Sequence, residues 1–72
     1  MSEIGKRIKA LREKEGVTQR QMAHHSNLSQ GTIGNIEAGI SLPNYYTLID
    51  FADYFQVSLD DLVGRNPWSI NI

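Results

Sequence analysis

The strongest constraint in this sequence is the regular recurrence of helix start and stop signals, which divide it into five short segments of helical character. In the first segment, Ile4, Ile8 and Leu11 recur at i, i+4 and i+7 among Lys, Arg and Glu residues, and Gly16 follows as a stop signal. Helical periods and caps fill the sequence up to residue 65, and no strand pattern competes with them there. The sequence therefore predicts an all-α fold, a compact domain of five helices over residues 1–65.

The second and third segments are short and lie close together in the sequence. Thr18 and Gln21 form a T-x-x-Q capping box, which predicts a helix over residues 18–25. Ser29 offers the next N-cap, so the third helix is predicted over residues 29–37. About three residues join the two helices, which is the spacing of a helix-turn-helix unit.

Small and apolar residues inside this unit predict how its two helices pack. Met22 and Ala23 face inward from the first helix, and Ala23 leaves room for the second helix to cross. Asn27 lies in the turn and is among the few non-glycine types that tolerate a positive φ. Ile33 and Ile36 face inward from the second helix. The residues that remain on its outer face are Gln30, Gly31, Thr32, Gly34 and Asn35.

This outer face carries amides and a hydroxyl, but no charge and no large apolar group. Such groups match the donor and acceptor pattern that base edges present in the major groove of DNA. The five residues are therefore candidate base contacts, and an ordinary exposed helix face is the alternative interpretation.

Two further helices follow the predicted helix-turn-helix unit. Pro43 precedes the first, whose predicted apolar stripe consists of Tyr45, Leu48, Ile49, Ala52 and Phe55. Ser58 is the predicted N-cap of the last helix, Asp61 lies in its first turn, and Gly64 closes it. The residues of this helix that we expect to pack inward are Leu59, Leu62 and Val63.

Composition excludes several classes of function. The chain has no cysteine, so a disulfide framework and a Cys-based zinc finger are impossible. No apolar run approaches the roughly 18 residues of a membrane span, and no signal-peptide pattern opens the chain, so we expect a cytoplasmic protein. His24 and His25 have no partner ligands at helical spacing, so a metal site is not expected. No nucleophile–base pair, cofactor loop or small-molecule site is evident, and we expect no enzymatic activity.

Charge is unevenly distributed, although the net charge is only −1. Residues 1–25 hold six basic residues against three acidic ones, a balance of +3, whereas residues 26–72 hold one basic residue against five acidic ones, a balance of −4. Such a domain can turn a basic face toward phosphates, although solvated helix faces explain the same pattern.

Three ordered motifs resemble the lambda-repressor/Cro-like (XRE) helix-turn-helix family. They are I-G-K-R-I-K-A-L-R-E-K-E-G-V-T-Q-R-Q-M-A from Ile4, L-S-Q-G-T-I-G-N-I-E-A-G from Leu28 and V-S-L-D-D-L from Val57, with Pro43 between the last two. The resemblance runs from about Ile4 to Gly64, most of the chain, and implies a sequence-specific DNA-binding domain.

The resemblance also implies roles for individual residues. Gln19 matches a glutamine that holds a phosphate and braces the recognition helix. Gln30 matches the first base-contacting glutamine, whose amide fits adenine N6 and N7. Thr32 and Asn35 match positions that face the groove. The full set of expected contacts to the DNA backbone is Arg12, Thr18, Gln19, Gly39, Ser41 and Asn44.

Other positions concern structure or depart from the family pattern. Arg12 and Glu37 match a pair that locks the first helix to the recognition helix. Asn27 and Gln56 stand where the family often has glycine. Gln56 is expected to carry some strain or to end its helix differently. Two glycines in the recognition helix, Gly31 and Gly34, each cost roughly 1 kcal/mol relative to alanine. In some relatives, glycine there lets the helix approach a thymine methyl or a base edge.

Together these features predict a transcriptional regulator, most simply a repressor, that binds a palindromic double-stranded DNA operator as a homodimer. Relatives pair through the C-terminal helix, which points to Leu59, Leu62 and Val63, and to Trp68 in the tail. For the tail, residues 66–72, a dimer contact, a linker and a frayed end remain open. Phage-type repressor, Cro-like protein, restriction–modification controller and antitoxin also remain open. A protein-interaction module that does not bind DNA is the alternative from another class.

Overall fold

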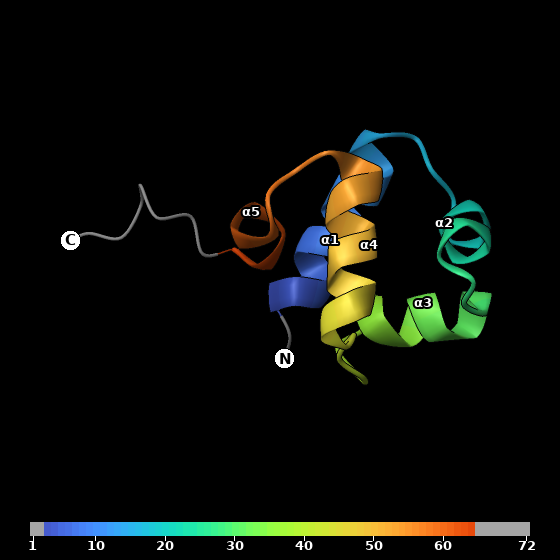
Figure 1. The fold of residues 1–72 in the computed structure, drawn as a ribbon. Helices are drawn as coiled ribbons and strands as arrows, with labels where there is room; N and C mark the ends of the chain where they lie inside the picture. The colour runs from blue at the N-terminus through green and yellow to red at the C-terminus, as the bar shows by residue number, and fades with distance from the viewer. Residues whose placement is uncertain (1–2, 65–72) are drawn as a thin grey trace.

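The computed structural model of this chain describes residues 3–64. It contains α1 (Glu3–Lys14), α2 (Gln19–Ser26), α3 (Gln30–Glu37), α4 (Tyr45–Phe55) and α5 (Leu59–Val63), and no strand occurs within the described range. In Figure 1, α2 and α3 lie on one side of α1 and α4, and α5 lies on the other. The predicted all-α fold with five helices is confirmed.

The helix boundaries follow from polar caps. Thr18 accepts a hydrogen bond from the backbone N–H of Gln21 at 3.0 Å, and the Gln21 side chain accepts one from the backbone N–H of Thr18 at 2.8 Å. This confirms the predicted capping box. The helices α2 and α3 begin one residue later than predicted, because Thr18 and Ser29 keep extended backbone (ψ 160° and 156°) as caps. Ser58 caps α5 as predicted, and Asn44 is an additional cap before α4.

Two non-glycine residues adopt the left-handed backbone conformation. Asn27 has φ 57° in the turn between α2 and α3, and Gln56 has φ 56° at the end of α4. Both observations agree with the sequence-based expectations. Asparagine adopts this region at lower energetic cost than most residues. Glutamine lacks this advantage, so the close approach of its Cβ to the following carbonyl oxygen destabilises the conformation. Gln56 is therefore a strained position away from the helix-turn-helix unit.

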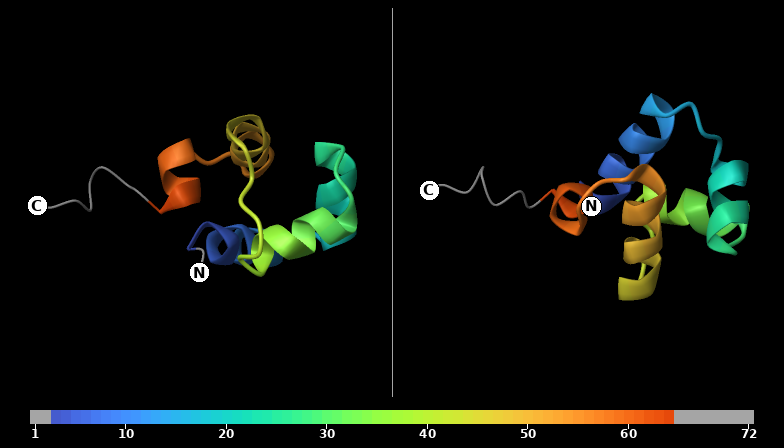
Figure 2. Two further views of the ribbon diagram at one scale, coloured as in Figure 1. Left: turned by 90° about the horizontal axis from the view of Figure 1, so that it is seen from below. Right: turned by 45° about the horizontal axis from the view of Figure 1, so that its top comes forward.

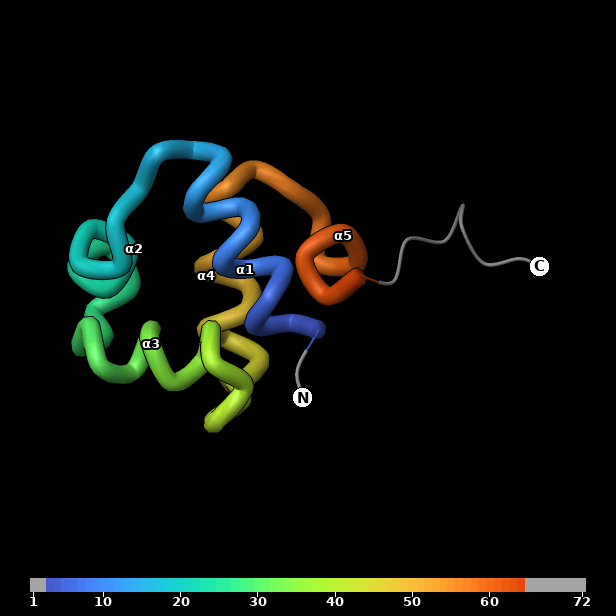
Figure 3. The backbone as a smooth tube through the Cα atoms, turned by 180° about the vertical axis from the view of Figure 1, so that it is seen from behind, coloured from blue at the N-terminus to red at the C-terminus, as the bar shows by residue number. Residues whose placement is uncertain are grey.

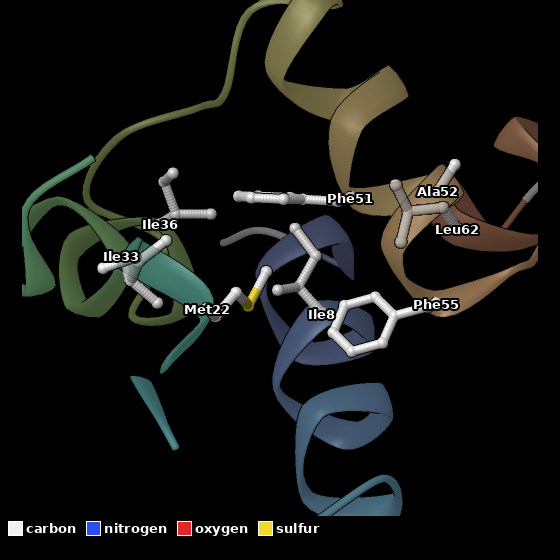
Figure 4. Close-up of a cluster of buried hydrophobic side chains, with 9 residues drawn as sticks. Ile8, Met22, Ile33, Ile36, Phe51, Ala52, Phe55 and Leu62 are labelled. Carbon is white, nitrogen blue, oxygen red and sulfur yellow. The ribbon is translucent and has the colours of Figure 1, made fainter. Parts of the chain in front are cut away.

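All five helices contribute to one hydrophobic core (Figure 4). Its buried members are Ile8, Met22, Ala23, Ile33, Ile36, Phe51, Ala52, Phe55 and Leu62. The inward orientation predicted for the apolar residues of α2 and α3 is confirmed. The predicted stripe of α4 is wrong at two points, since Phe51 is fully buried and Tyr45 is 59% exposed. Tyr45 opens the helix and contacts Tyr46 edge-on, with ring centroids 5.6 Å apart, instead of entering the core.

The last helix requires one correction to the predicted dimer contacts. Leu62 is fully buried within the core, so its side chain has no surface to offer a partner. Leu59 and Val63 are half-buried on the same short helix, and the predicted contact at Trp68 lies outside the described residues. No helix in the described part of the chain is long and apolar enough to cross a membrane.

The C-terminal end of α3 meets α1. Seen from below, in the left view of Figure 2, α3 extends from α2 toward the N-terminal half of α1. Figure 3 shows the same approach from behind. At this meeting point the backbone of Ile36 and Glu37 lies against Gly5 of α1.

Candidate nucleic-acid interface

The turn between α2 and α3 has helix-turn-helix geometry. Three residues, 27–29, separate the two helices, as the sequence predicts. The backbone N–H of Leu28 donates to the carbonyl oxygen of Ala23 at 2.9 Å, which closes the turn against the end of α2. Ala23 itself is buried, consistent with a small residue where the helices cross.

Gln30, Gly31 and Asn35 form the exposed part of the outer face of α3. Thr32 and Gly34 were predicted to share this face but are half-buried at its edge. The hydroxyl of Thr32 lies 2.9 Å from that of Ser29, which also accepts a hydrogen bond from the Thr32 backbone N–H. Thr32 therefore contributes to the cap of α3, and its hydroxyl is less free than the amides of Gln30 and Asn35.

The two glycines of α3 have space around them. A Cβ at Gly31 would meet only the Ser29 hydroxyl oxygen, at 3.8 Å, and a Cβ at Gly34 would meet only the amide atoms of Gln19, at 3.9 Å. Both are ordinary van der Waals distances. Packing within the domain therefore does not require glycine at either position, even though glycine weakens a helix.

On the inner side, Glu37 is the centre of a charged hydrogen-bond network. Arg12 on α1 donates to both carboxylate oxygens of Glu37, from Nε at 2.6 Å and from Nη2 at 3.0 Å. Gln19 on α2 donates from Nε2 to the same carboxylate, also at 3.0 Å. The network joins three helices at the end of α3, and the predicted pairing of Arg12 with Glu37 is confirmed.

Burial makes this ion pair different from a surface pair. Only 12% of the Arg12 side chain and 3% of the Glu37 side chain are exposed. The hydrogen bond to Glu37 raises the pKa of Arg12 above its ordinary value against the opposing effect of desolvation. The third Arg12 nitrogen, Nη1, donates to the carbonyl oxygen of Val17 at 3.0 Å. Arg12 is thus engaged at all three nitrogens inside the domain and contributes to structure more than to the exposed surface.

The remaining candidate backbone contacts are near the two ends of the helix-turn-helix unit. Thr18 and Ser41 are exposed, and Gln19 and Gly39 are half-buried. Asn44 is exposed, and its side-chain oxygen accepts a hydrogen bond from the backbone N–H of Thr47 at 2.9 Å. Its amide nitrogen is therefore the group that can donate to a phosphate. These contacts stay predictions.

Sequence reasoning did not identify two features of this region. One is Gly5 on α1, which is buried where α1 meets the last turn of α3. The other is an apolar surface of four exposed side chains after α3: Ile40, Leu42, Tyr45 and Tyr46. Only the glycine in the I-G-K-R motif signals the first feature, and the run without charges from residue 38 to 49 signals the second.

The histidines of α2 are exposed, as expected. The ring of His25 lies 4.3 Å from that of Tyr54 on α4, centroid to centroid. Within residues 3–64, no group of three or more His, Cys, Asp or Glu side chains is arranged to hold a metal ion.

Comparisons with known proteins agree with this geometry. A family model described as helix-turn-helix matches residues 8–62. The HTH-type transcriptional regulator ImmR of Bacillus subtilis is 33% identical over 66 residues, which cover 92% of this chain and 52% of ImmR. YazB of the same organism, an uncharacterized HTH-type transcriptional regulator, is 38% identical over 81% of this chain and 84% of its own length. This chain therefore spans about half of ImmR and most of YazB.

Solved structures show the same fold. The P22 c2 repressor, in complex with a synthetic operator, has a TM-score of 0.82 and 26% identity, and the match covers 92% of this chain and 100% of that one. A transcriptional regulator from Listeria innocua has a TM-score of 0.83 and 28% identity, over 89% of this chain and 61% of the other. With its three-residue turn, its buried α2–α3 contact and these matches, the chain belongs to the helix-turn-helix family of transcriptional regulators and phage repressors.

Proposed function

We propose that this domain binds a specific double-stranded DNA site through the outer face of α3 and represses transcription by occupying promoter DNA. The observation that carries the proposal is the exposed, uncharged and polar surface formed by Gln30, Gly31 and Asn35 on a helix whose other side is buried. Amides at such positions match the base edges of the major groove. The P22 c2 repressor, whose fold is similar, is in complex with a synthetic operator, which supports DNA as the ligand.

Residues around the outer face of α3 are proposed to bind the phosphates of the DNA backbone. Gln19 uses one amide hydrogen for Glu37, and its nitrogen carries a second that can donate to a phosphate oxygen. Thr18, Gly39, Ser41 and Asn44 supply further donors from side chains or backbone. Exposed basic residues of α1 and α2 provide the attraction at longer range: Lys6, Lys9, Lys14 and Arg20.

The proposed functional unit is a homodimer. One α3 contacts few bases, so useful specificity requires two copies on half-sites about one helical turn apart. Leu59 and Val63, both half-buried on α5, are the proposed contacts between protomers. The dimer predicts a site with two-fold symmetry.

Selection of bound duplexes from random DNA tests this proposal directly. We expect a palindromic site. The logarithm of its binding constant should fall linearly with the logarithm of salt concentration, since phosphate contacts release counterions. Equal affinity for selected and scrambled duplexes, or binding that is insensitive to salt, would overturn DNA recognition. A selected site without symmetry would overturn the homodimer alone.

A variant of Gln30 localises the recognition surface. Gln30 is exposed, and its side chain makes no hydrogen bond with residues 3–64, so Gln30→Ala should leave the unfolding temperature nearly unchanged. Loss of a bidentate base contact should weaken binding to the selected site by about 1–3 kcal/mol. Fluorescence anisotropy on the selected and scrambled duplexes measures both affinities, and the scrambled duplex should show little change. An equal loss on both duplexes would contradict base recognition by this residue.

The exposed apolar surface after α3 favours one alternative function, a protein-interaction module. Its four side chains are 59–77% exposed, and apolar surface of this kind is common at protein interfaces. Size-exclusion chromatography with and without the selected duplex separates the two functions. Co-elution with DNA supports the primary proposal, and failure to retain any duplex supports the alternative.

A further inference from the structure

Gly5 lies on α1 where this helix packs directly against the backbone of α3. A Cβ at this position would overlap the carbonyl oxygen of Ile36, and it would lie 2.9 Å from the carbonyl oxygen and 3.2 Å from the carbonyl carbon of Glu37. All three neighbours are backbone atoms of α3, which cannot rotate away as a side chain can. Only glycine therefore permits the observed distance between these two helices.

Gly5 differs in this respect from Gly16, Gly31, Gly34 and Gly64. A Cβ at Gly31 or Gly34 would make only ordinary van der Waals contacts, and one at Gly16 would meet nothing within 4 Å. A Cβ at Gly64 would meet only the flexible side chain of Arg7. Gly5 is also buried, on a helix, 31 positions before Ile36 in the sequence. The absence of a side chain at Gly5 is therefore specifically a requirement of the α1–α3 contact.

The same end of α3 is held by side chains. Glu37, whose backbone faces Gly5, binds Arg12 of α1 and Gln19 of α2 through its carboxylate. We call the group formed by Gly5, Arg12, Gln19, Ile36 and Glu37 the α1–α3 seam. Within this seam, the lack of a side chain at Gly5 permits the close approach of the two backbones, and the ion pair links the two helices through side chains.

We propose that Gly5 is a positioning residue for DNA recognition, which sets the depth at which α3 projects from the domain. This inference rests on the proposed DNA binding by α3. It concerns a residue that does not reach the DNA and acts only through the backbone of Ile36 and Glu37.

Displacement of α3 is the expected result of a side chain at this position. Optimal contacts between carbon atoms are roughly 3.5–4.0 Å, so relief of the overlap requires a separation on the order of 1 Å. On α1, Ile8 is fully buried three residues later, and Arg7 donates from Nε to the carbonyl oxygen of Asp61 on α5 at 3.0 Å. Because α1 is held on these sides, the shift is transmitted to α3.

Such a shift should affect base recognition more than attraction to phosphates. Hydrogen bonds to base edges require donor–acceptor distances near 2.9 Å and good alignment. The affinity gained by releasing counterions from the phosphates depends mainly on charge. A displaced α3 should therefore lose discrimination between duplexes while it keeps its salt-dependent affinity. This separation of effects is the distinguishing property of a positioning residue here.

Gly5→Ala tests the proposal, with Gly16→Ala as the matched control. The control makes the same substitution at φ 70° in an open position, so it adds backbone strain without touching α3. Both variants should lower the unfolding temperature measured by circular dichroism. Affinities are then measured by anisotropy for the selected and scrambled duplexes, at a temperature where each variant is fully folded.

We expect Gly5→Ala to lower the ratio of specific to non-specific affinity roughly tenfold or more, as for the loss of one good base contact. Affinity for the scrambled duplex and the slope of affinity against salt should be nearly those of wild type, and Gly16→Ala should keep the wild-type ratio. An unchanged ratio in folded Gly5→Ala overturns the positioning role. A wild-type protein that does not discriminate between the duplexes overturns the proposed function instead.

If Gly5→Ala does not fold, two further measurements still test the proposal. Gln56→Gly relieves the strained φ of 56° far along the chain, and Gly5→Ala can be measured in that background against Gln56→Gly alone. If the double variant also fails to fold, nuclear Overhauser contacts between Gly5 and the last turn of α3 are measured in the wild type. Persistence of these contacts on binding to the selected duplex supports the proposal, and their loss overturns it.

Discussion

The inner face of α3 carries Ile33, Ile36 and Glu37, all buried, whereas its outer face presents Gln30, Gly31 and Asn35, all exposed. A full ion pair is enclosed on the inner side, and the outer side has no charge. The inner face is satisfied within the domain, since every carboxylate oxygen of Glu37 has a donor. The outer face leaves its amides without partners in the described structure, as a surface for external recognition requires.

Glycine occurs at both faces for opposite physical reasons. Against the inner face, Gly5 is required because backbone atoms of α3 occupy the space of a Cβ. On the outer face, Gly31 has space for a Cβ and lowers helix stability without a compensating contact. A glycine that stabilises nothing inside the domain is consistent with close approach by an external molecule. The two faces therefore separate the residue proposed to position α3 from the residues proposed to contact DNA.

The largest expected effect concerns the ion pair of the inner face. Arg12→Met leaves the buried Glu37 carboxylate with Gln19 as its remaining hydrogen-bond donor, so the free energy of unfolding should fall by roughly 3–5 kcal/mol. Urea unfolding followed by circular dichroism measures the loss. Glu13→Gln, at an exposed neighbour on the same helix, should change stability by only about 0.5 kcal/mol. A loss near 1 kcal/mol in Arg12→Met would place the pair among ordinary surface pairs and weaken the contrast between the faces.

An intermediate effect is expected on the outer face, with opposite signs for stability and binding. Gly31→Ala should raise the free energy of unfolding by about 1 kcal/mol, because alanine is the better helix former and the Cβ has space. The same methyl group should obstruct DNA and lower affinity for the selected duplex about tenfold, or 1.4 kcal/mol. Thermal unfolding and anisotropy measure the two quantities. If affinity rises together with stability, Gly31 does not face the DNA.

The smallest expected effect concerns the N-terminus of α3, which belongs to neither face. The Ser29 hydroxyl accepts from the backbone N–H of Thr32 at 3.1 Å, so Ser29→Ala should lower the free energy of unfolding by about 1 kcal/mol. Ser29→Gly should cost only a few tenths of a kcal/mol. Thermal unfolding of the two variants side by side checks the order. A larger loss for glycine would show that the hydroxyl is not the stabilising group.

Much of the local structure was predictable from the sequence because caps and turns are local interactions. Thr18 with Gln21, Ser29 and Asn27 were assigned correctly, since each acts on residues within three or four positions of itself. The Arg12–Glu37 pair followed from the resemblance to a family. The predicted stripe of α4 included Tyr45 and left out Phe51, because helical period alone does not show which part of α4 its neighbours cover.

The sequence by itself determined an all-α chain of five capped helices, a helix-turn-helix unit and an uncharged polar face on its second helix. Only the tertiary structure decided that Leu62 is enclosed in the core, that Thr32 turns toward the cap, and that Gly5 touches the backbone of α3. The physical reason is that caps and helical faces depend on residues a turn apart. The distance between two backbones depends on how distant segments pack, so the glycine of the I-G-K-R motif does not by itself show that it touches α3.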